Sequence, residues 1–202
     1  MVVYTVMLMK TIKFFVCAFS CVLLSACLIP EKFTAKIDVK PDASYTVNFN
    51  GTMAHVLALA QKVKGGKLSD KDEQALKAEA DKLSKAPDFK KAVYRGDGRY
   101  ELEIVSNKLA GQPFKMDTFS VQTDKEGIMT ISSIAVSDKD KKAFSELGIK
   151  MDGLLEVSLP KNAEIISHNA MSTPSFFGLM GGYSWKIGSI NERPMMRVKI
   201  KR

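Results

Sequence analysis

The chain has 202 residues and a formal net charge of +8, a length that suits one domain with a sizeable buried core. It contains three cysteines and two histidines, His55 and His168, and neither type recurs at a spacing typical of metal ligands or a catalytic dyad. We therefore expect no bound metal and no cofactor.

The first predicted element is a bacterial lipoprotein signal peptide. Lys10 and Lys13 precede an apolar run over residues 14–24, which is shorter than a membrane-spanning helix requires. The run ends in Leu24-Ser25-Ala26-Cys27, which fits the lipobox pattern of an aliphatic residue, two small residues and a cysteine. We expect cleavage between Ala26 and Cys27 and acylation of the Cys27 thiol. The alternative is an uncleaved anchor helix.

Processing at this position divides the chain into three segments. Residues 1–26 are the signal peptide, residues 27–31 are a lipidated amino terminus with a short tether, and residues 32–202 are a single globular domain. Translation starts at Met1 or Met9, and Met9 is the more natural start because it places Lys10 at the amino terminus of a compact signal peptide. With a start at Met1, residues 1–8 lengthen the charged region.

The lipobox also predicts where the protein acts. We expect a lipid-anchored protein of the bacterial cell envelope, a location that excludes nucleic acid as a partner. Leu28 follows the cysteine at the position where an aspartate commonly retains lipoproteins at the inner membrane. In a host with two membranes, we therefore favour the periplasmic face of the outer membrane. Loss of Lys10 and Lys13 leaves a net charge of +6, which suits either anionic head groups or ordinary solubility.

The next segment predicts a β-hairpin over residues 32–50. Apolar residues occupy every second position from Phe33 to Val39 and again from Tyr45 to Phe49, so each strand has one apolar face. Pro41-Asp42-Ala43 supplies the turn between them.

A helical pair is predicted after this hairpin. The helix over Met53–Val63 is opened by Gly51-Thr52, is apolar on more than one face and is stopped by Gly65-Gly66. Ser69, with Asp72 three residues later, resembles a capping box and opens the second helix.

Strand patterns return from residue 90. Arg95-Gly96-Asp97-Gly98 contains an Asp-Gly pair typical of a tight hairpin turn, which we favour over a role in adhesion for its Arg-Gly-Asp tripeptide. Ser137 is predicted to cap a short helix through Leu147, and strands around Trp185 and over residues 196–200 complete an antiparallel series. The predicted fold is α+β and mainly antiparallel β. We expect a curved sheet, sandwich or open barrel, with an inserted helical pair and one further short helix.

The chain lacks the common catalytic motifs. It has no Gly-x-Ser-x-Gly elbow, no His-Glu-x-x-His pair and no phosphate-binding loop. We therefore expect a protein that is not an enzyme.

Two apolar segments are candidate contacts for a lipid or a partner. The first helix, through Val56, Leu59 and Val63, either packs on the sheet or closes an apolar cavity. A glycine-rich loop over residues 174–183 either folds over the core or exposes its large apolar residues to acyl chains or a partner. These residues are Phe176, Phe177, Leu179 and Met180.

The start and the end of the chain together resemble the LppM-type bacterial lipoprotein domain. The similarity lies in the lipobox cysteine with an early strand, in Val39–Tyr45, in Leu159–Asn169 and in Tyr183–Ile187, and it covers roughly half of the mature chain. The resemblance implies an envelope-anchored, mostly β domain that contacts lipid or glycolipid, and it implies no catalytic residues.

Two functional hypotheses follow from these observations. The protein is either a module that binds an amphipathic lipid or glycolipid, or a structural or assembly lipoprotein that docks on an envelope protein complex. An apolar cavity beside the early helices would favour the first hypothesis, and a solid core with an exposed patch at residues 176–180 would favour the second.

Overall fold

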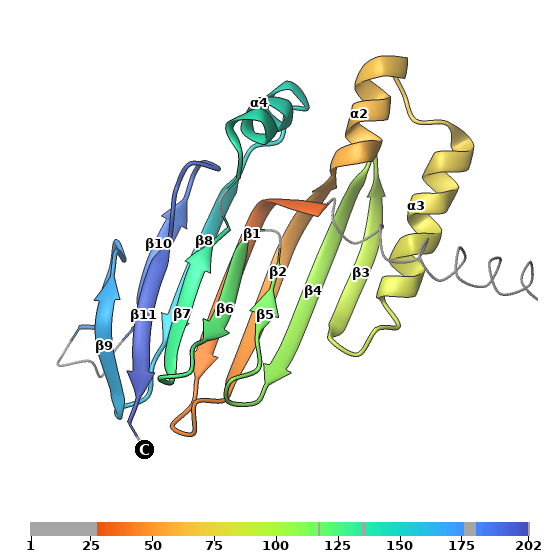
Figure 1. Ribbon diagram of the computed structural model, residues 1–202. Coiled ribbons are helices and arrows are strands. Elements are labelled where there is room, and N and C mark those ends of the chain that lie inside the picture. The colour runs from red at the N-terminus through yellow and green to blue at the C-terminus, as the bar shows by residue number, and fades with distance from the viewer. Residues whose placement is uncertain (1–27, 117, 135, 176–180, 202) are drawn as a thin grey trace, which may run out of the picture.

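A computed structural model describes residues 28–116, 118–134, 136–175 and 181–201 (Figure 1). They form an α+β fold that is mainly β, as predicted. In spatial order, the six-stranded sheet consists of β10 (Tyr183–Ile187), β8 (Asp152–Ser158), β1 (Leu28–Val39), β2 (Tyr45–His55), β4 (Arg99–Lys108) and β3 (Phe89–Gly96). The five-stranded sheet consists of β5 (Phe114–Lys115), β6 (Phe119–Thr123), β7 (Ile128–Ser133), β11 (Met195–Ile200) and β9 (Ala163–His168).

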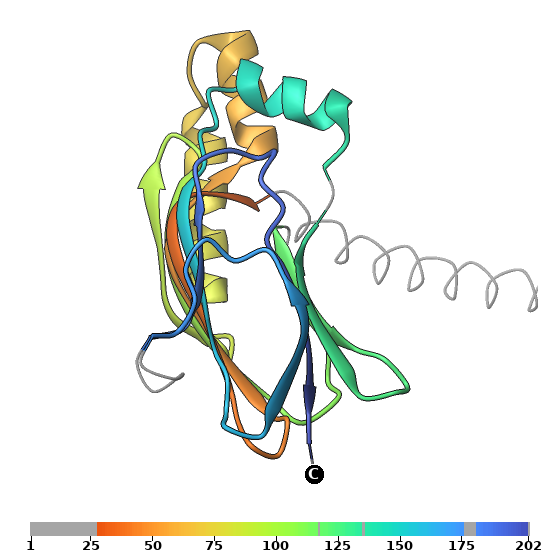
Figure 2. The ribbon, with the colours of Figure 1, turned by 90° about the vertical axis from the view of Figure 1, so that its left-hand side faces the viewer.

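The two sheets face each other and enclose the main core between them (Figure 2). Side chains alternate along each strand, so that Ala35 and Ile37 of β1 are fully buried whereas Lys36 between them is exposed. Met196 and Val198 of β11 are equally buried in the facing sheet. Two sheets packed in this way form an open sandwich, one of the three forms that the sequence predicts.

One strand pairing differs from the predicted antiparallel series. β1 and β8 run parallel, with Lys32 opposite Asp152 and Asp38 opposite Ser158. A parallel pair requires a long crossover. Here the chain first completes the neighbouring strands of the same sheet, then forms β5, β6 and β7 of the other sheet and one further helix, and only then returns as β8. The alternation of apolar residues predicts that a segment is a strand, but it does not predict the strand's partner.

The first hairpin is longer than its sequence pattern indicates. β1 already begins at Leu28, within the predicted tether, and β2 continues to His55. Gly51 does not end β2 but lies within it, where a Cβ atom would come 2.6 Å from the Cβ of Phe33. A glycine inside a strand often marks such a close approach of two chain segments.

The first helix of the pair, α2 (Val56–Gly65), consequently begins three residues later than predicted. His55 caps it, because its Nδ1 accepts the backbone N–H of Ala58 at 3.1 Å. Gly66, at φ 78°, ends the helix as the sequence indicates.

The second helix of the pair, α3 (Asp70–Leu83), extends the second layer over β3 and β4, beside the five-stranded sheet (Figure 2). Its Leu76 and Ala80 are buried. The hydroxyl group of Tyr100 on β4 donates to the carboxylate of Glu79 at 2.8 Å, which fixes the helix to the sheet.

The helix α4 (Asp138–Glu146) and α3 have the caps that the sequence predicts. Ser69 accepts the backbone N–H of Asp72, and Ser137 accepts that of Asp140, each at 3.2 Å. These caps are predictable because both partners lie within one turn of the chain.

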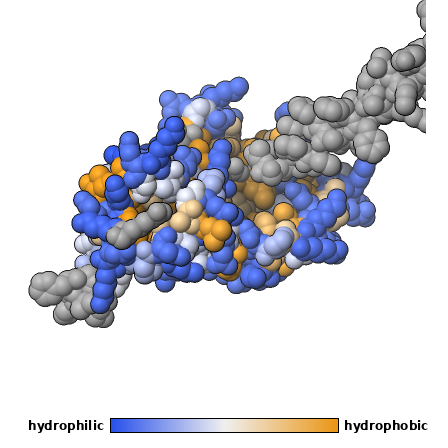
Figure 3. Space-filling model, turned by 60° about the horizontal axis from the view of Figure 1, so that its bottom comes forward, coloured by the Kyte–Doolittle hydropathy of each residue, from blue (hydrophilic) through white to orange (hydrophobic). Residues whose placement is uncertain are grey.

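The two ends of the sandwich are covered by different elements. α2 and α4 lie at one end, and the long hairpin turns lie at the other (Figure 1, Figure 2). Seen toward the hairpin end, apolar residues show between rims of polar ones (Figure 3). Leu109, which is 69% exposed, follows β4 at this end.

Candidate functional site

A groove of about 570 Å³ lies at the end of the sandwich that carries α4. It is formed by α4, by residues 149–152 that lead into β8 and by the connection over residues 188–194 that joins β10 to β11. Its apolar lining consists of Phe144, Ile149, Met151 and Ile190. A concave, mainly apolar surface with a few polar groups is the usual form of a small-molecule site.

The wall of the groove is attached to the first described residues of the chain. Phe144 of α4 and Leu147, which follows the helix, pack against a small buried cluster that contains Ile29 of β1, Leu59 of α2 and Ile149. No side chain of α4 is itself fully buried, so this cluster is what holds the helix on the sandwich.

A narrower cavity of about 30 Å³ adjoins the groove and shares Met151, Ser189 and Ile190 with it. It reaches the hydroxyl groups of Thr118 and Ser133, whose oxygen atoms are buried and have no hydrogen-bond partner among the described residues. This volume holds about one water molecule. The groove therefore adjoins a small, mainly apolar recess between the sheets, whose lining includes the side chains of Thr118 and Ser133.

Basic side chains surround the groove. Lys32 and Lys150 line it as exposed residues, and Lys141 lines it while forming an ion pair with Asp138 at 2.7 Å. The hydrogen bond from Lys141 lowers the pKa of the Asp138 carboxyl group. Asp152 is the single acidic residue of the lining, so cations outnumber carboxylates at the rim and favour an anionic group there.

The connection over residues 188–194 is braced by its own hydrogen bonds. The backbone N–H of Gly188 donates to the carboxylate of Glu192 at 2.9 Å, and the guanidinium of Arg193 donates to the carbonyl of Ile190 at 3.1 Å. These bonds hold Ile190 against the groove.

The helix residues predicted as lipid contacts lie elsewhere. Leu59 is buried in the small cluster, Val56 packs against that cluster, and Val63 is 65% exposed. None of the three lines the groove, because α2 directs its apolar face toward β1 and β2. The predicted cavity beside the early helices is therefore replaced by a groove at α4.

The other predicted contacts, Phe176, Phe177, Leu179 and Met180, lie outside the described residues, as do Ala26 and Cys27. Leu28, which follows the predicted acylation site, is the first described residue and pairs with His55. The lining residues of the groove were missed because they come from segments far apart in sequence. The one local signal is the lone Phe144 in the otherwise polar helix α4.

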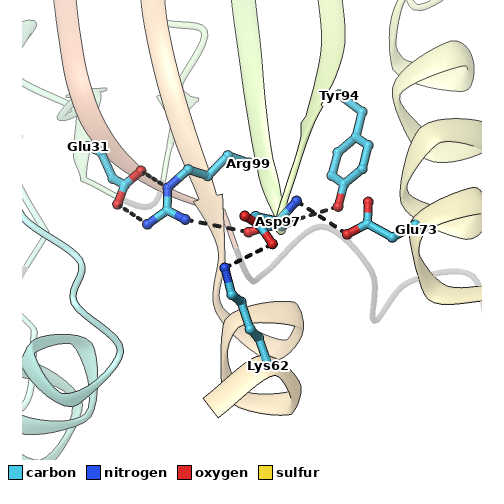
Figure 4. A network of polar contacts seen from close by, with 7 residues as sticks. Glu31, Lys62, Glu73, Tyr94, Asp97 and Arg99 are labelled. Carbon is cyan, nitrogen blue, oxygen red and sulfur yellow. Dashed lines mark hydrogen bonds and ion pairs between the residues drawn. The ribbon is translucent and has the colours of Figure 1, made fainter. Parts of the chain in front are cut away.

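A polar network joins α2, α3 and the start of β1 around the turn between β3 and β4 (Figure 4). The carboxylate of Asp97 binds Lys62 at 2.9 Å, and this hydrogen bond lowers the pKa of Asp97. The backbone N–H of Asp97 donates to Glu73 at 3.3 Å, while Arg99 binds Glu31 at 2.8 Å. The Asp-Gly pair forms the predicted hairpin turn, and the carboxylate of Asp97 stabilises the fold through its ion pair with Lys62.

The described residues contain no cluster of three or more histidine, cysteine or acidic side chains that is arranged to hold a metal ion. His55 caps α2, and His168 accepts the backbone N–H of Ala170 while its ring packs against Tyr183. Both histidines therefore have structural contacts.

Comparison with known proteins does not assign the chain to a family. No family model matches the chain, and a search of curated proteins gives no match. Over the part of the chain that the structure describes, no helix is long and apolar enough to cross a membrane. The groove and the sequence that precedes β1 are therefore the features of this chain that bear on its function.

Proposed function

We propose that the protein is a bacterial lipoprotein, anchored through acylated Cys27, whose domain binds an amphipathic lipid or glycolipid without catalysing a reaction. The observation that carries the proposal is the groove of about 570 Å³, which combines apolar walls with a basic rim. Acyl chains match the walls, since each buried methylene group contributes about 0.8 kcal/mol. An anionic head group matches the lysines of the rim.

The position of the groove also supports this proposal. Its wall α4 packs on the cluster that contains Ile29, two residues after the predicted acylation site. A protein held at a membrane by Cys27 would thus present the groove near the source of its ligand. The resemblance to the LppM-type domain points to the same ligand class, and Leu28 after the cysteine favours the outer membrane where the host has one.

Native mass spectrometry of the full chain, expressed with its own signal and purified in detergent, tests the binding proposal. We expect one non-covalently bound lipid per protein. A Phe144→Ser/Ile190→Ser variant should lose it, because both side chains line the groove and neither is fully buried. Leu109→Ser is the matched control, since Leu109 is exposed at the opposite end. Equal lipid content in all three proteins, or none in any, would contradict the proposal.

One observation favours the alternative of an assembly lipoprotein. The edge strand β9 exposes Ile165 and Ile166 by 42% and 43%, and Met171 beyond it is 71% exposed. An unpaired strand edge with apolar side chains suits the addition of a strand from an envelope protein. A β9 variant, Ile165→Lys/Ile166→Lys, would then lose a partner that co-purifies with the unaltered chain, while the groove variant would keep it.

A further inference from the structure

The folded domain begins directly after the predicted acylation site. Leu28, the residue after Cys27, already pairs with His55 at the end of β2. Ile29 is 7% exposed and belongs to the small cluster under α2 and α4. Because consecutive Cα atoms lie about 3.8 Å apart, acylation of Cys27 would tether the domain within one residue of Leu28, at this end of the sandwich.

The first residues of β1 are also fixed to the rest of the fold. Two nitrogens of Arg99 donate to the two carboxylate oxygens of Glu31, at 2.8 and 3.1 Å. The side chain of Glu31 is only 13% exposed. Arg99 in turn adjoins the turn at Asp97, which binds Lys62 of α2 (Figure 4). An anchor on Cys27 therefore sets the orientation of the whole domain as well as its distance from the bilayer.

The surface at this end suits the head-group layer of a bilayer. Leu57 of α2 is 57% exposed, and it shares one helix face with Gln61 and Lys64, at spacings of four and seven residues. Val63 is 65% exposed near the end of the same helix, and Lys67 follows it. Exposed apolar side chains beside lysines suit this layer, because the apolar groups can enter it while the lysines stay with the anionic head groups.

Net charge alone does not make this end of the sandwich prefer the bilayer. α4 carries three lysines, but Asp138, Asp140 and Glu146 offset them, and the first turn of α3 is acidic. Contact with the bilayer must therefore come mainly from the tether and from the apolar residues of α2.

We propose that the end formed by α2, α4 and the connection over residues 188–194 faces the bilayer, with Leu57 and Val63 in contact with the head-group layer. This inference rests on the proposed acylation of Cys27. The hairpin end then points away from the membrane. β4 has ten residues, so Leu109 at that end lies about 30 Å from the membrane-facing end.

Two exposed leucines at opposite ends allow a direct test. After processing, the chain would have no free thiol, since Cys17 and Cys21 lie in the signal peptide and Cys27 is acylated. Leu57→Cys and Leu109→Cys therefore each create a single labelling site. The acylated protein is labelled with a fluorophore and reconstituted into phosphatidylethanolamine and phosphatidylglycerol vesicles that contain lipids with a spin label near the head group.

We expect the label at position 57 to lose most of its fluorescence and the label at position 109 to keep nearly all of it. Lys64→Cys, on the same face of α2, should behave like Leu57→Cys and guards against a local folding defect at position 57. Equal quenching at the two ends, or stronger quenching at position 109, would overturn the orientation. The mass of the purified protein is measured first: an unacylated protein would overturn the anchor together with this inference, whereas an acylated protein with equal quenching would overturn the inference alone.

Discussion

Gly98 lies against Ala58, so that the turn between β3 and β4 packs directly under α2. A Cβ atom on Gly98 would lie 2.9 Å from the Cβ of Ala58, and Gly98 has a φ of +71°. Its carbonyl oxygen also accepts the N–H of His55, the cap of α2. The hairpin turn thus positions the helix at the proposed membrane-facing end.

We expect Gly98→Ala to destabilise the domain by about 2–5 kcal/mol, because left-handed backbone strain of about 1–2 kcal/mol adds to overpacking of about 1–3 kcal/mol. Gly111→Ala is the matched control. Gly111 has a φ of +79°, but no atom would touch its Cβ, so only the backbone strain of about 1–2 kcal/mol remains. Urea unfolding measures both variants, and equal losses would show that the contact with Ala58 is unimportant.

The ion pair between Glu31 and Arg99 should contribute more than an exposed pair. A double-mutant cycle with Glu31→Gln and Arg99→Gln should give a coupling energy of about 1 kcal/mol, since Glu31 is largely buried while Arg99 is partly exposed and screened. The pair Lys142–Glu146 on α4 is the control. Its atoms are 4.0 Å apart and its side chains are 80% and 66% exposed, so coupling close to zero is expected. Equal coupling in both cycles would contradict a fixed start of β1.

Acylation should depend on Cys27 alone among the three cysteines of the chain. In Cys27→Ala, we expect no incorporation of labelled fatty acid and accumulation of the uncleaved precursor, because the thiol is the proposed acceptor. Cys21→Ala should be labelled and cleaved normally, since Cys21 lies within the apolar run. Normal labelling of the Cys27→Ala protein would remove the proposed anchor.

Local features of the fold were predictable from the sequence, and their partners in space were not. Caps at Ser69 and Ser137 and the turn at Asp97 depend on residues within a few positions, so the sequence pattern identifies them. The parallel pairing of β1 with β8 depends on segments more than a hundred residues apart. Gly51 was misleading, because a glycine ends a strand in one context and permits close packing against Phe33 in another.

The candidate site was less predictable than the fold. Four lining residues come from β1, α4, the connection before β8 and the connection after β10, and they meet only after the chain has crossed between the sheets: Lys32, Phe144, Met151 and Ile190. The apolar residues of α2 gave a stronger sequence signal. That signal reflects packing, since Leu59 is buried in the small cluster. Helical periodicity indicates which face is apolar and leaves open whether a ligand or the protein's own core covers it.

The tyrosines predict how stability changes at high pH. Burial raises the pKa of Tyr45 and of Tyr94 to about 12, and burial likewise raises the pKa of Tyr100 and Tyr183 above the ordinary value of 10.0. Between pH 10 and 12 the folded protein therefore binds more protons than the unfolded chain. The stability that the buried, neutral tyrosines contribute is fully present below pH 10, and it should be lost as the pH rises toward 12. Tyrosinate absorbance and circular dichroism, recorded together, should show ionisation delayed beyond pH 10 and coincident with unfolding, whereas in denaturant the tyrosines should titrate near pH 10. Complete ionisation near pH 10 with unchanged circular dichroism would contradict the burial of these side chains in solution.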